Sequence, residues 1–258
     1  MKLFLPSNIF SEILAAVLKK NDDLEINFKE SSLITKELEK DTMAIGLIPS
    51  LDIINHKNLF ISGKAGISFD GTLANSYFYL TKNEQRTLGT VAIRGDVSLN
   101  EIIFTKILFE ERFSSEVEIA LDTHKEPVKD QNTLVVGTEN FKLWDYNNSI
   151  SFADLMADLL DFPYVNFIFA SQDQDQLSKL ETIIENIDSN IEENISSYLK
   201  DLNYPDDVKL LVQENLGSVY FEMTPNETEA LNELIKLVYY HGVIEEIFDI
   251  KFNSVDKY

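Results

Sequence analysis

Residues 2–18 read KLFLPSNIFSEILAAVL, and this stretch decides how the chain begins to fold. The apolar run at residues 2–5 is typical of a short buried strand, and Pro6 follows it directly. After Asn8, apolar side chains recur at helical spacing, which predicts a helix with Ser7 or Asn8 as its N-cap. The opening therefore predicts a strand followed directly by a helix.

The same alternation continues along the chain. A strand at 24–28, a short helix from Ser31 or Ser32 to about Lys40 and a buried strand at 43–48 complete a β-α-β-α-β beginning. This order predicts an α/β fold with largely parallel strands. Further strands are expected at 59–61, 65–69, 76–80, 90–93, 117–121, 133–136 and 164–170, and further helices after Ser98 and at 151–160.

The last third of the sequence no longer alternates between strands and helices. No convincing central strand follows residue 172, and helices are expected at about 174–201, 206–216 and 225–240. Thr224, Pro225 and Glu227 form a strong helix start, with cap, N1 proline and N3 glutamate. The middle of the chain forms an α/β unit of its own, and the helices after residue 172 are expected to pack back on the first part of the chain. This order predicts two lobes. We assign 1–87 and 172–258 to lobe one and 88–171 to lobe two.

Composition excludes several classes of function. The 258 residues include 22 Lys and Arg against 44 Asp and Glu, a formal charge of −22 that repels nucleic acid and anionic lipid. The chain has no cysteine, which excludes disulfides and thiolate chemistry. Its three histidines lie far apart with no ligand spacing between them, so no histidine metal site is expected.

The sequence also carries an expectation about location. It contains no apolar run of membrane-spanning length, and residues 1–5 are too short for the apolar core of a signal peptide. We therefore expect a cytoplasmic protein without membrane contacts, present as a monomer or homodimer.

Three junctions carry polar residues where a strand ends, the edge at which open α/β sheets bind ligands. The first is the stretch 6–8, PSN, where Asn8 could bind a ligand or simply cap the helix. The second is the stretch 67–72, ISFDGT, which also suits a plain β-turn. The third is 95–101, GDVSLNE, where Ser98 and Glu101 also fit a capping box without any ligand.

Taken in order, these segments resemble a menaquinone-biosynthesis family that includes chorismate dehydratase of the futalosine route. The resemblance rests on segment order and spacing over most of the chain. The matching segments are 45–50 (IGLIPS), 66–71 (GISFDG), 106–113 (KILFEERF), 134–137 (LVVG), 161–165 (DFPYV), 167–170 (FIFA), 224–227 (TPNE) and 240–243 (YHGV). This family has the type II periplasmic-binding-protein fold, so the resemblance implies two lobes with mixed sheets flanked by helices and a ligand cleft between them.

The resemblance also implies a reaction and a set of site residues. The family eliminates water from chorismate without a metal or organic cofactor, so a small anionic carboxylate substrate is expected. Asn8 and Ser68 match the family's polar positions nearest the chemistry and are the implied catalytic residues. The implied substrate-binding residues are Ser50, Asp70, Gly71, Thr72, Ser98 and Asn100.

Two hypotheses follow, because the match is incomplete. The family usually has Tyr-x-Asn at residues 6–8 and Ser-x-Thr-Ser at 98–101, where this chain has Pro-Ser-Asn and Ser-Leu-Asn-Glu. The first hypothesis is a chorismate dehydratase-like lyase. The alternative is a non-catalytic binding protein that closes on a carboxylate metabolite.

Overall fold

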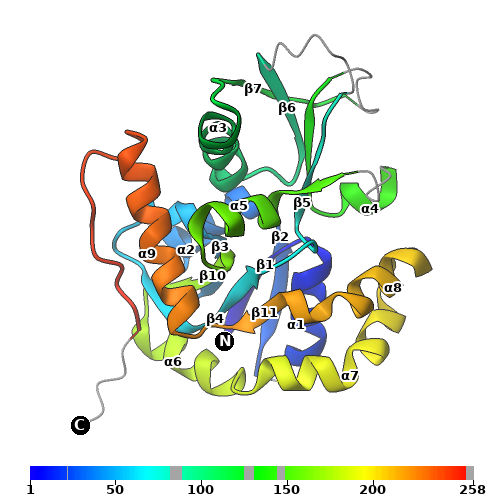
Figure 1. Ribbon diagram of the computed structural model, residues 1–258. Helices are drawn as coiled ribbons and strands as arrows, with labels where there is room; N and C mark the ends of the chain where they lie inside the picture. Colours follow the sequence, from blue (N-terminus) through cyan, green and yellow to red (C-terminus); the bar gives the residue numbers. More distant parts are fainter. Residues whose placement is uncertain (22, 82–88, 125–130, 144–148, 254–258) are drawn as a thin grey trace.

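A computed structural model describes residues 1–21, 23–81, 89–124, 131–143 and 149–253 of the chain. Two mixed sheets flanked by helices form two lobes, which confirms the predicted type II fold class (Figure 1). The larger sheet has the strand order β11-β4-β10-β3-β1-β2, and the smaller sheet has the order β7-β6-β8-β5-β9.

The elements have the following bounds. The larger sheet contains β1 (Lys2–Pro6), β2 (Glu25–Lys29), β3 (Ile45–Pro49), β4 (Phe60–Phe69), β10 (Tyr164–Ser171) and β11 (Val219–Glu222). The smaller contains β5 (Ser76–Tyr79), β6 (Thr90–Gly95), β7 (Glu118–Leu121), β8 (Thr133–Val136) and β9 (Ile150–Ser151). The helices are α1 (Ile9–Leu18), α2 (Ile34–Lys40), α3 (Leu99–Phe113), α4 (Glu139–Leu143), α5 (Phe152–Leu160), α6 (Gln174–Ile183), α7 (Ile187–Asp201), α8 (Asp206–Glu214) and α9 (Pro225–Tyr240), with short 3₁₀ turns η1 (Ser31–Leu33) and η2 (Ser50–Ile54).

The first lobe begins as predicted. β1 pairs in parallel with both β2 and β3, and α1 starts after Asn8, whose side chain accepts a hydrogen bond from the Ser11 amide at 2.9 Å. α2 packs closely on β3 at Gly46, where an added Cβ would lie 2.6 Å from Ile34 Cγ2. The β-α-β-α-β opening therefore builds one half of the larger sheet, with β2 at the edge.

The other side of this sheet departs from the predictions. The strands expected at 59–61 and 65–69 are one continuous strand, β4, which β10 pairs across two register shifts. Gly63 therefore does not break the strand, because irregular pairing accommodates it. β11 was missed, since four residues between helical segments carry little periodic signal; it pairs with β4 at the sheet edge.

The second lobe is built around β6. β7 and β8 flank β6 in parallel, and β5 pairs antiparallel with β8 and β9. α3 begins at the predicted capping box: Ser98 caps the helix, and Glu101 accepts from the Ser98 amide at 2.9 Å. The predicted start of α9 also has both capping-box bonds, between Thr224 and Glu227.

The chain crosses between the sheets at two places, after β4 and before β10. β5 therefore belongs to the smaller sheet and β10 to the larger, whereas the predicted division placed 76–80 in lobe one and 164–170 in lobe two. β10 joins the larger sheet because it is buried along its whole length between β3 and β4. The predicted boundary between residues 87 and 88 falls in 82–88, outside the described residues.

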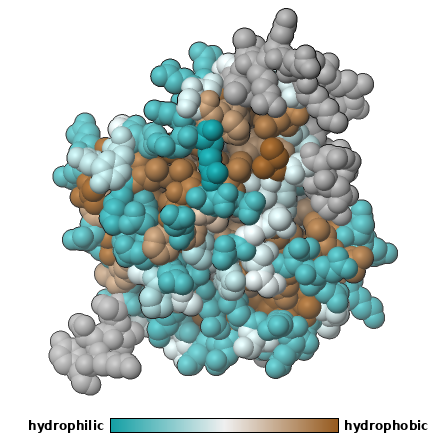
Figure 2. Space-filling model, in the orientation of Figure 1, coloured by the Kyte–Doolittle hydropathy of each residue, from teal (hydrophilic) through white to brown (hydrophobic). Residues whose placement is uncertain are grey.

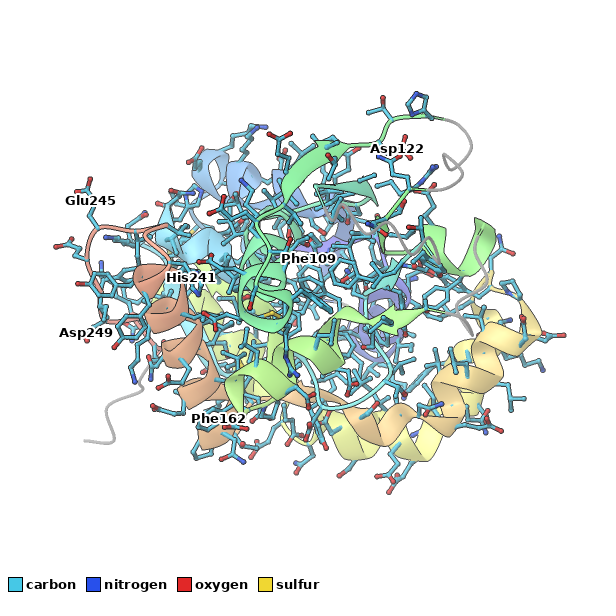
Figure 3. The ribbon with its side chains drawn as sticks, turned by 45° about the horizontal axis from the view of Figure 1, so that its top comes forward. Phe109, Asp122, Phe162, His241, Glu245 and Asp249 are labelled. Carbon is cyan, nitrogen blue, oxygen red and sulfur yellow. The ribbon has the colours of Figure 1, made fainter. Side chains whose placement is uncertain are left out.

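The helices after residue 172 differ from the prediction at one place. The single helix expected at 174–201 is two helices, α6 and α7, separated near Asn186, which has a positive φ of 59°. α7 packs against α1, and α9 reaches from the larger sheet to α3 (Figure 3). There, the His241 ring nitrogens lie 3.1 Å from Glu110 Oε2 and 2.9 Å from Glu111 Oε1.

The surface is mainly hydrophilic, as expected from the many charged residues in the sequence. Hydrophilic side chains cover most of the face shown in Figure 2, with smaller apolar patches between them. Within the described ranges, no helix has both the length and the apolar character needed to cross a bilayer.

Candidate functional site

A cleft of about 440 Å³ lies between the lobes, where strands of both sheets end. Lobe one lines it with Ser7 after β1 and with Glu30 and Ser32 after β2. Lobe two lines it with the ends of β6, β7 and β8 and the first residue of α4. Small-molecule pockets occupy roughly 300–1,000 Å³ and lie at such strand ends in α/β folds. This cleft is therefore the candidate binding site.

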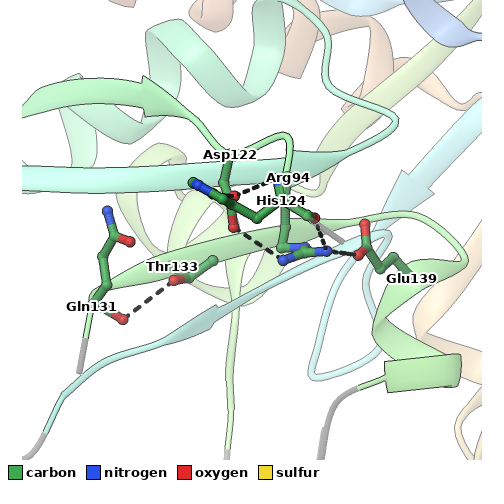
Figure 4. Close-up of polar contacts among 6 residues, drawn as sticks. All are labelled: Arg94, Asp122, His124, Gln131, Thr133 and Glu139. Atoms are coloured by element: carbon green, nitrogen blue, oxygen red, sulfur yellow. Dashed lines mark hydrogen bonds and ion pairs between the residues drawn. The ribbon is translucent and has the colours of Figure 1, made fainter. Parts of the chain in front are cut away.

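Arg94, near the end of β6, supplies the positive charge among the described lining residues and is only 4% exposed. Its Nε donates to Glu139 Oε1 at 2.7 Å, and its Nη1 donates to Asp122 Oδ2 at 3.0 Å (Figure 4). Nη2 donates both to Glu139 Oε1 and to the His124 carbonyl oxygen, the latter at 3.2 Å. Four of the five N–H groups of the guanidinium are therefore committed inside the chain.

A hydrogen-bonded contact joins the two lobes across the cleft. The Asp96 carboxylate, which follows β6, accepts from the Ser31 amide at 2.8 Å and from the Ser31 hydroxyl at 2.6 Å. Ser31 begins η1 in lobe one, so a carboxylate from lobe two occupies the positive end of this turn. Burial raises the pKa of Asp96, while both hydrogen bonds from Ser31 act in the opposite direction.

A second contact between the lobes centres on Asn100, which is fully buried in α3. Its Oδ1 accepts from the Leu51 amide at 2.9 Å. Its Nδ2 donates to the Asn166 carbonyl at 2.8 Å and to Ser50 Oγ at 3.2 Å. Because η2 and β10 belong to the larger sheet's lobe, this one side chain ties α3 to both. Both polar atoms of the Asn100 side-chain amide are therefore hydrogen-bonded within the chain.

Buried acids surround this junction. Glu101 is 1% exposed, and burial raises its pKa despite the hydrogen bonds from Ser98. Burial likewise raises the pKa of Asp52 to about 7, with the charge of Glu101 acting in the same direction. Burial and the nearby Glu101 charge raise the pKa of Tyr164 as well. The junction is therefore a buried, acid-rich interior rather than an open site.

Asn8 and Ser68, the two predicted catalytic residues, are both buried. Asn8 caps α1 with its oxygen, and Ser68 lies on β4 opposite Val165 and Tyr220. Asn8 Nδ2 and Ser68 Oγ have no hydrogen-bond partner among the described residues. Each predicted catalytic residue thus has one unused polar atom.

Asp70, Gly71 and Thr72 form the turn that follows β4. The Asp70 amide donates to the Ser218 carbonyl at 2.9 Å, and Gly71 has a positive φ of 150°. An added Cβ at Gly71 would lie 2.9 Å from Ser218 Cβ, so glycine is needed here for close approach. Thr72 lines a separate groove with Ser151 and is exposed to solvent.

The structure therefore brings together only part of the predicted set. Ser50, Ser98 and Asn100 meet: the Ser98 hydroxyl accepts from the Asn100 amide at 3.2 Å, and Asn100 contacts Ser50. None of the eight predicted residues is among those lining the interlobe cleft. Their neighbours line it instead, with Ser7 beside Asn8 and Val97 beside Ser98.

Five residues give the cleft its charge, and sequence reasoning missed four of them: Glu30, Arg94, Asp122 and Glu139. The fifth, Asp96, lies in the predicted junction 95–101 but was not singled out. One signal was available: Arg94 stands inside the apolar strand TVAIRG, and a buried arginine requires partners. The identity of those partners had no local signal, because Asp122 and Glu139 lie 28 and 45 residues further along the chain.

In the part of the chain that the structure describes, no group of three or more His, Cys, Asp or Glu side chains is arranged to hold a metal ion.

Comparison with known proteins supports the fold. No protein-family model matches the sequence, and no curated protein sequence matches it. Among solved structures, the chain is similar to protein AF1704 from Archaeoglobus fulgidus, with a TM-score of 0.60 and 12% identity over 94% of this chain and 98% of that one.

Two further structures have the same architecture. The CA3427 gene product of Candida albicans, described as having the generic periplasmic binding protein fold, has a TM-score of 0.61 and 11% identity over 97% of this chain and 92% of that one. The periplasmic aliphatic sulphonate binding protein SsuA of Escherichia coli has a TM-score of 0.51 and 11% identity over 97% of this chain and 90% of that one. At these identities the likeness establishes the fold alone.

Proposed function

We propose that this protein is a non-catalytic binding protein that closes its two lobes on a small polar organic ligand. The observation that carries the proposal is the cleft of about 440 Å³ between the strand ends of both sheets. Hydroxyl groups of Ser7, Ser32 and Thr138 line it and can orient a ligand through hydrogen bonds. A cytoplasmic location and a monomeric or homodimeric state belong to the proposal as predictions.

Closure depends on contacts that already cross between the lobes. Ser31 and Asp96 approach each other directly at the cleft, and Asn100 connects the lobes beneath it. A ligand that contacts both walls would add to these bonds and favour the closed arrangement, since binding shifts a conformational equilibrium by its differential affinity.

A thermal-shift screen of small metabolites, followed by calorimetry, tests the proposal. A ligand at 100 times its dissociation constant stabilises a one-site protein by about 2.7 kcal/mol. Ser7→Trp should abolish binding, because the indole would fill part of the cleft that Ser7 lines. Ser189→Trp, at an exposed position of α7, is the matched control and should bind normally.

Mass spectrometry of the recovered ligand completes the test. An unchanged ligand supports a binding protein, whereas a converted ligand would show that the protein is an enzyme. The absence of any ligand whose binding Ser7→Trp removes would refute the proposal.

A chorismate dehydratase-like lyase is the second candidate, and one observation favours it. Asn8 and Ser68, the catalytic residues implied by the family resemblance, each retain an unpartnered polar atom in a buried position. Such groups can be used to orient a substrate and stabilise developing negative charge. Incubation with chorismate, followed by ultraviolet absorbance and mass spectrometry, tests this candidate. Turnover no greater than that of Asn8→Ala would eliminate it.

A further inference from the structure

Four acidic residues and one arginine are among the residues that line the interlobe cleft, with a summed formal charge of −3. Glu30 belongs to lobe one, whereas Asp96, Asp122 and Glu139 belong to lobe two, so both walls are acidic. The volume of about 440 Å³ is far larger than a bare metal ion requires and suits a small organic molecule. The sign of this charge constrains which molecules the cleft can accept.

The group best suited to binding an anion is already occupied. Arg94 commits four of its five N–H groups to Asp122, Glu139 and the His124 carbonyl. Removing those bonds in favour of a ligand carboxylate would leave two acids beside Arg94 without their counterion. A second anion would therefore meet a neutralised arginine and an excess of negative charge.

Three elements near the cleft, η1, α3 and α4, have an acid of the chain at their positive ends. The Asp96 carboxylate accepts the amide and hydroxyl of Ser31 at the start of η1. The start of α3 is capped by Ser98 and Glu101, and the first residue of α4 is Glu139 itself. An anionic ligand at any of these three positive ends would therefore meet an acid of the chain.

We infer that the ligand of this cleft is an organic cation carrying an amine, amidine or similar group. The inference rests on the proposed binding function and names the chemical class of its ligand. Glu30 contributes most directly, because it lines the cleft, is exposed, and has no salt bridge among the described ion pairs. Ser7, Ser32 and Thr138 hydroxyls can accept the ammonium hydrogens.

The test compares three classes of compound at equal concentration by thermal shift and calorimetry. The classes are aliphatic amines such as putrescine and agmatine, neutral polyols, and dicarboxylates such as succinate. Glu30→Gln keeps the side chain's shape and removes its charge. Glu193→Gln, at an exposed position of α7, makes the same change in net charge away from the cleft.

Amines should stabilise the protein. Glu30→Gln should weaken their binding about 3- to 10-fold, which is the effect expected from the Coulomb energy of one charge pair in a partly solvent-exposed site. Glu193→Gln should leave the affinity unchanged, and the Glu30 effect should shrink at high salt. Equal affinity for amines in both variants would assign them to the acidic surface in general and overturn the inference.

The remaining outcomes separate this inference from the proposed function. Polyols or dicarboxylates that bind alone, and are blocked by Ser7→Trp, would refute a cationic ligand while supporting a binding protein. A screen without any compound blocked by Ser7→Trp would refute both.

Discussion

Replacing Asn100 with alanine should loosen the connection between the lobes. The side chain makes three hydrogen bonds, to the Leu51 amide, the Asn166 carbonyl and Ser50 Oγ, in a fully buried position. A buried hydrogen bond contributes about 1 kcal/mol net, and a buried partner left unsatisfied costs about 1–3 kcal/mol. We expect Asn100→Ala to lower the free energy of unfolding by about 3–5 kcal/mol, a large share of the stability of about 5–15 kcal/mol typical of a domain.

Equilibrium urea unfolding followed by circular dichroism measures this loss. Asn226→Ala is the matched control, since Asn226 is exposed in the first turn of α9 and its side chain has no hydrogen bond among those described. Hydrogen exchange supplies a local readout: the Leu51 amide should exchange faster in Asn100→Ala, because its acceptor is gone.

Asn100→Asp sharpens the test. The aspartate keeps an acceptor for the Leu51 amide but places an oxygen opposite the Asn166 carbonyl, so it should also destabilise the protein. Equal urea midpoints for Asn100→Ala and Asn226→Ala would refute the assignment of Asn100 as the connection between the lobes.

Three further predictions concern the buried junction around Asn100 and the residues of the cleft. Burial raises the folded-state pKa of Asp52 to about 7, so the folded protein holds more protons than the unfolded chain between about pH 4 and 7. Stability should therefore fall as pH rises through this window, by at most about 1.4 kcal/mol per pH unit for this group, and urea unfolding of Asp52→Asn should show a flatter dependence. Arg94→Met removes the guanidinium partner of buried Asp122 and leaves it the contact with His124 Nδ1 at 2.6 Å. The change should cost about 3–5 kcal/mol in a urea titration, whereas a loss below about 1 kcal/mol would contradict the role given to the Arg94–Asp122 ion pair. Gly95 has a φ of 98°, and an added Cβ would lie 2.0 Å from the Val136 carbonyl, so Gly95→Ala should lower the melting temperature, while Gly89→Ala, with open space around it, should not.

Local patterns were enough to place most of the elements. The strand at Lys2–Pro6, the cap at Asn8 and the capping boxes at Ser98 and Thr224 all depend on residues within a few positions of each other. Such signals are readable because the period of apolar residues and the cap chemistry act over one or two turns. The resemblance to a family with the type II fold rested on the same ordered segments, and the architecture is confirmed.

The candidate site was predicted less completely, for an identifiable reason. Strand ends were the right places to search, and the cleft does lie there. Asn8 and Ser98, however, turn to their own helix starts, and their neighbours Ser7 and Val97 line the cleft. Side-chain direction at a junction depends on the loop backbone, which single-residue patterns do not specify.

By itself, the sequence determined the α/β order, the helix starts and the acidic surface, because these follow from local spacing and composition. Only the tertiary structure decided that Arg94 is neutralised by Asp122 and Glu139, and that Asp96 bonds to Ser31, 65 residues earlier in the chain. Pairings at such separations arise from the way two sheets pack and close, and no short segment encodes them. The charge of the cleft, and with it the class of ligand, is therefore a property of the folded molecule.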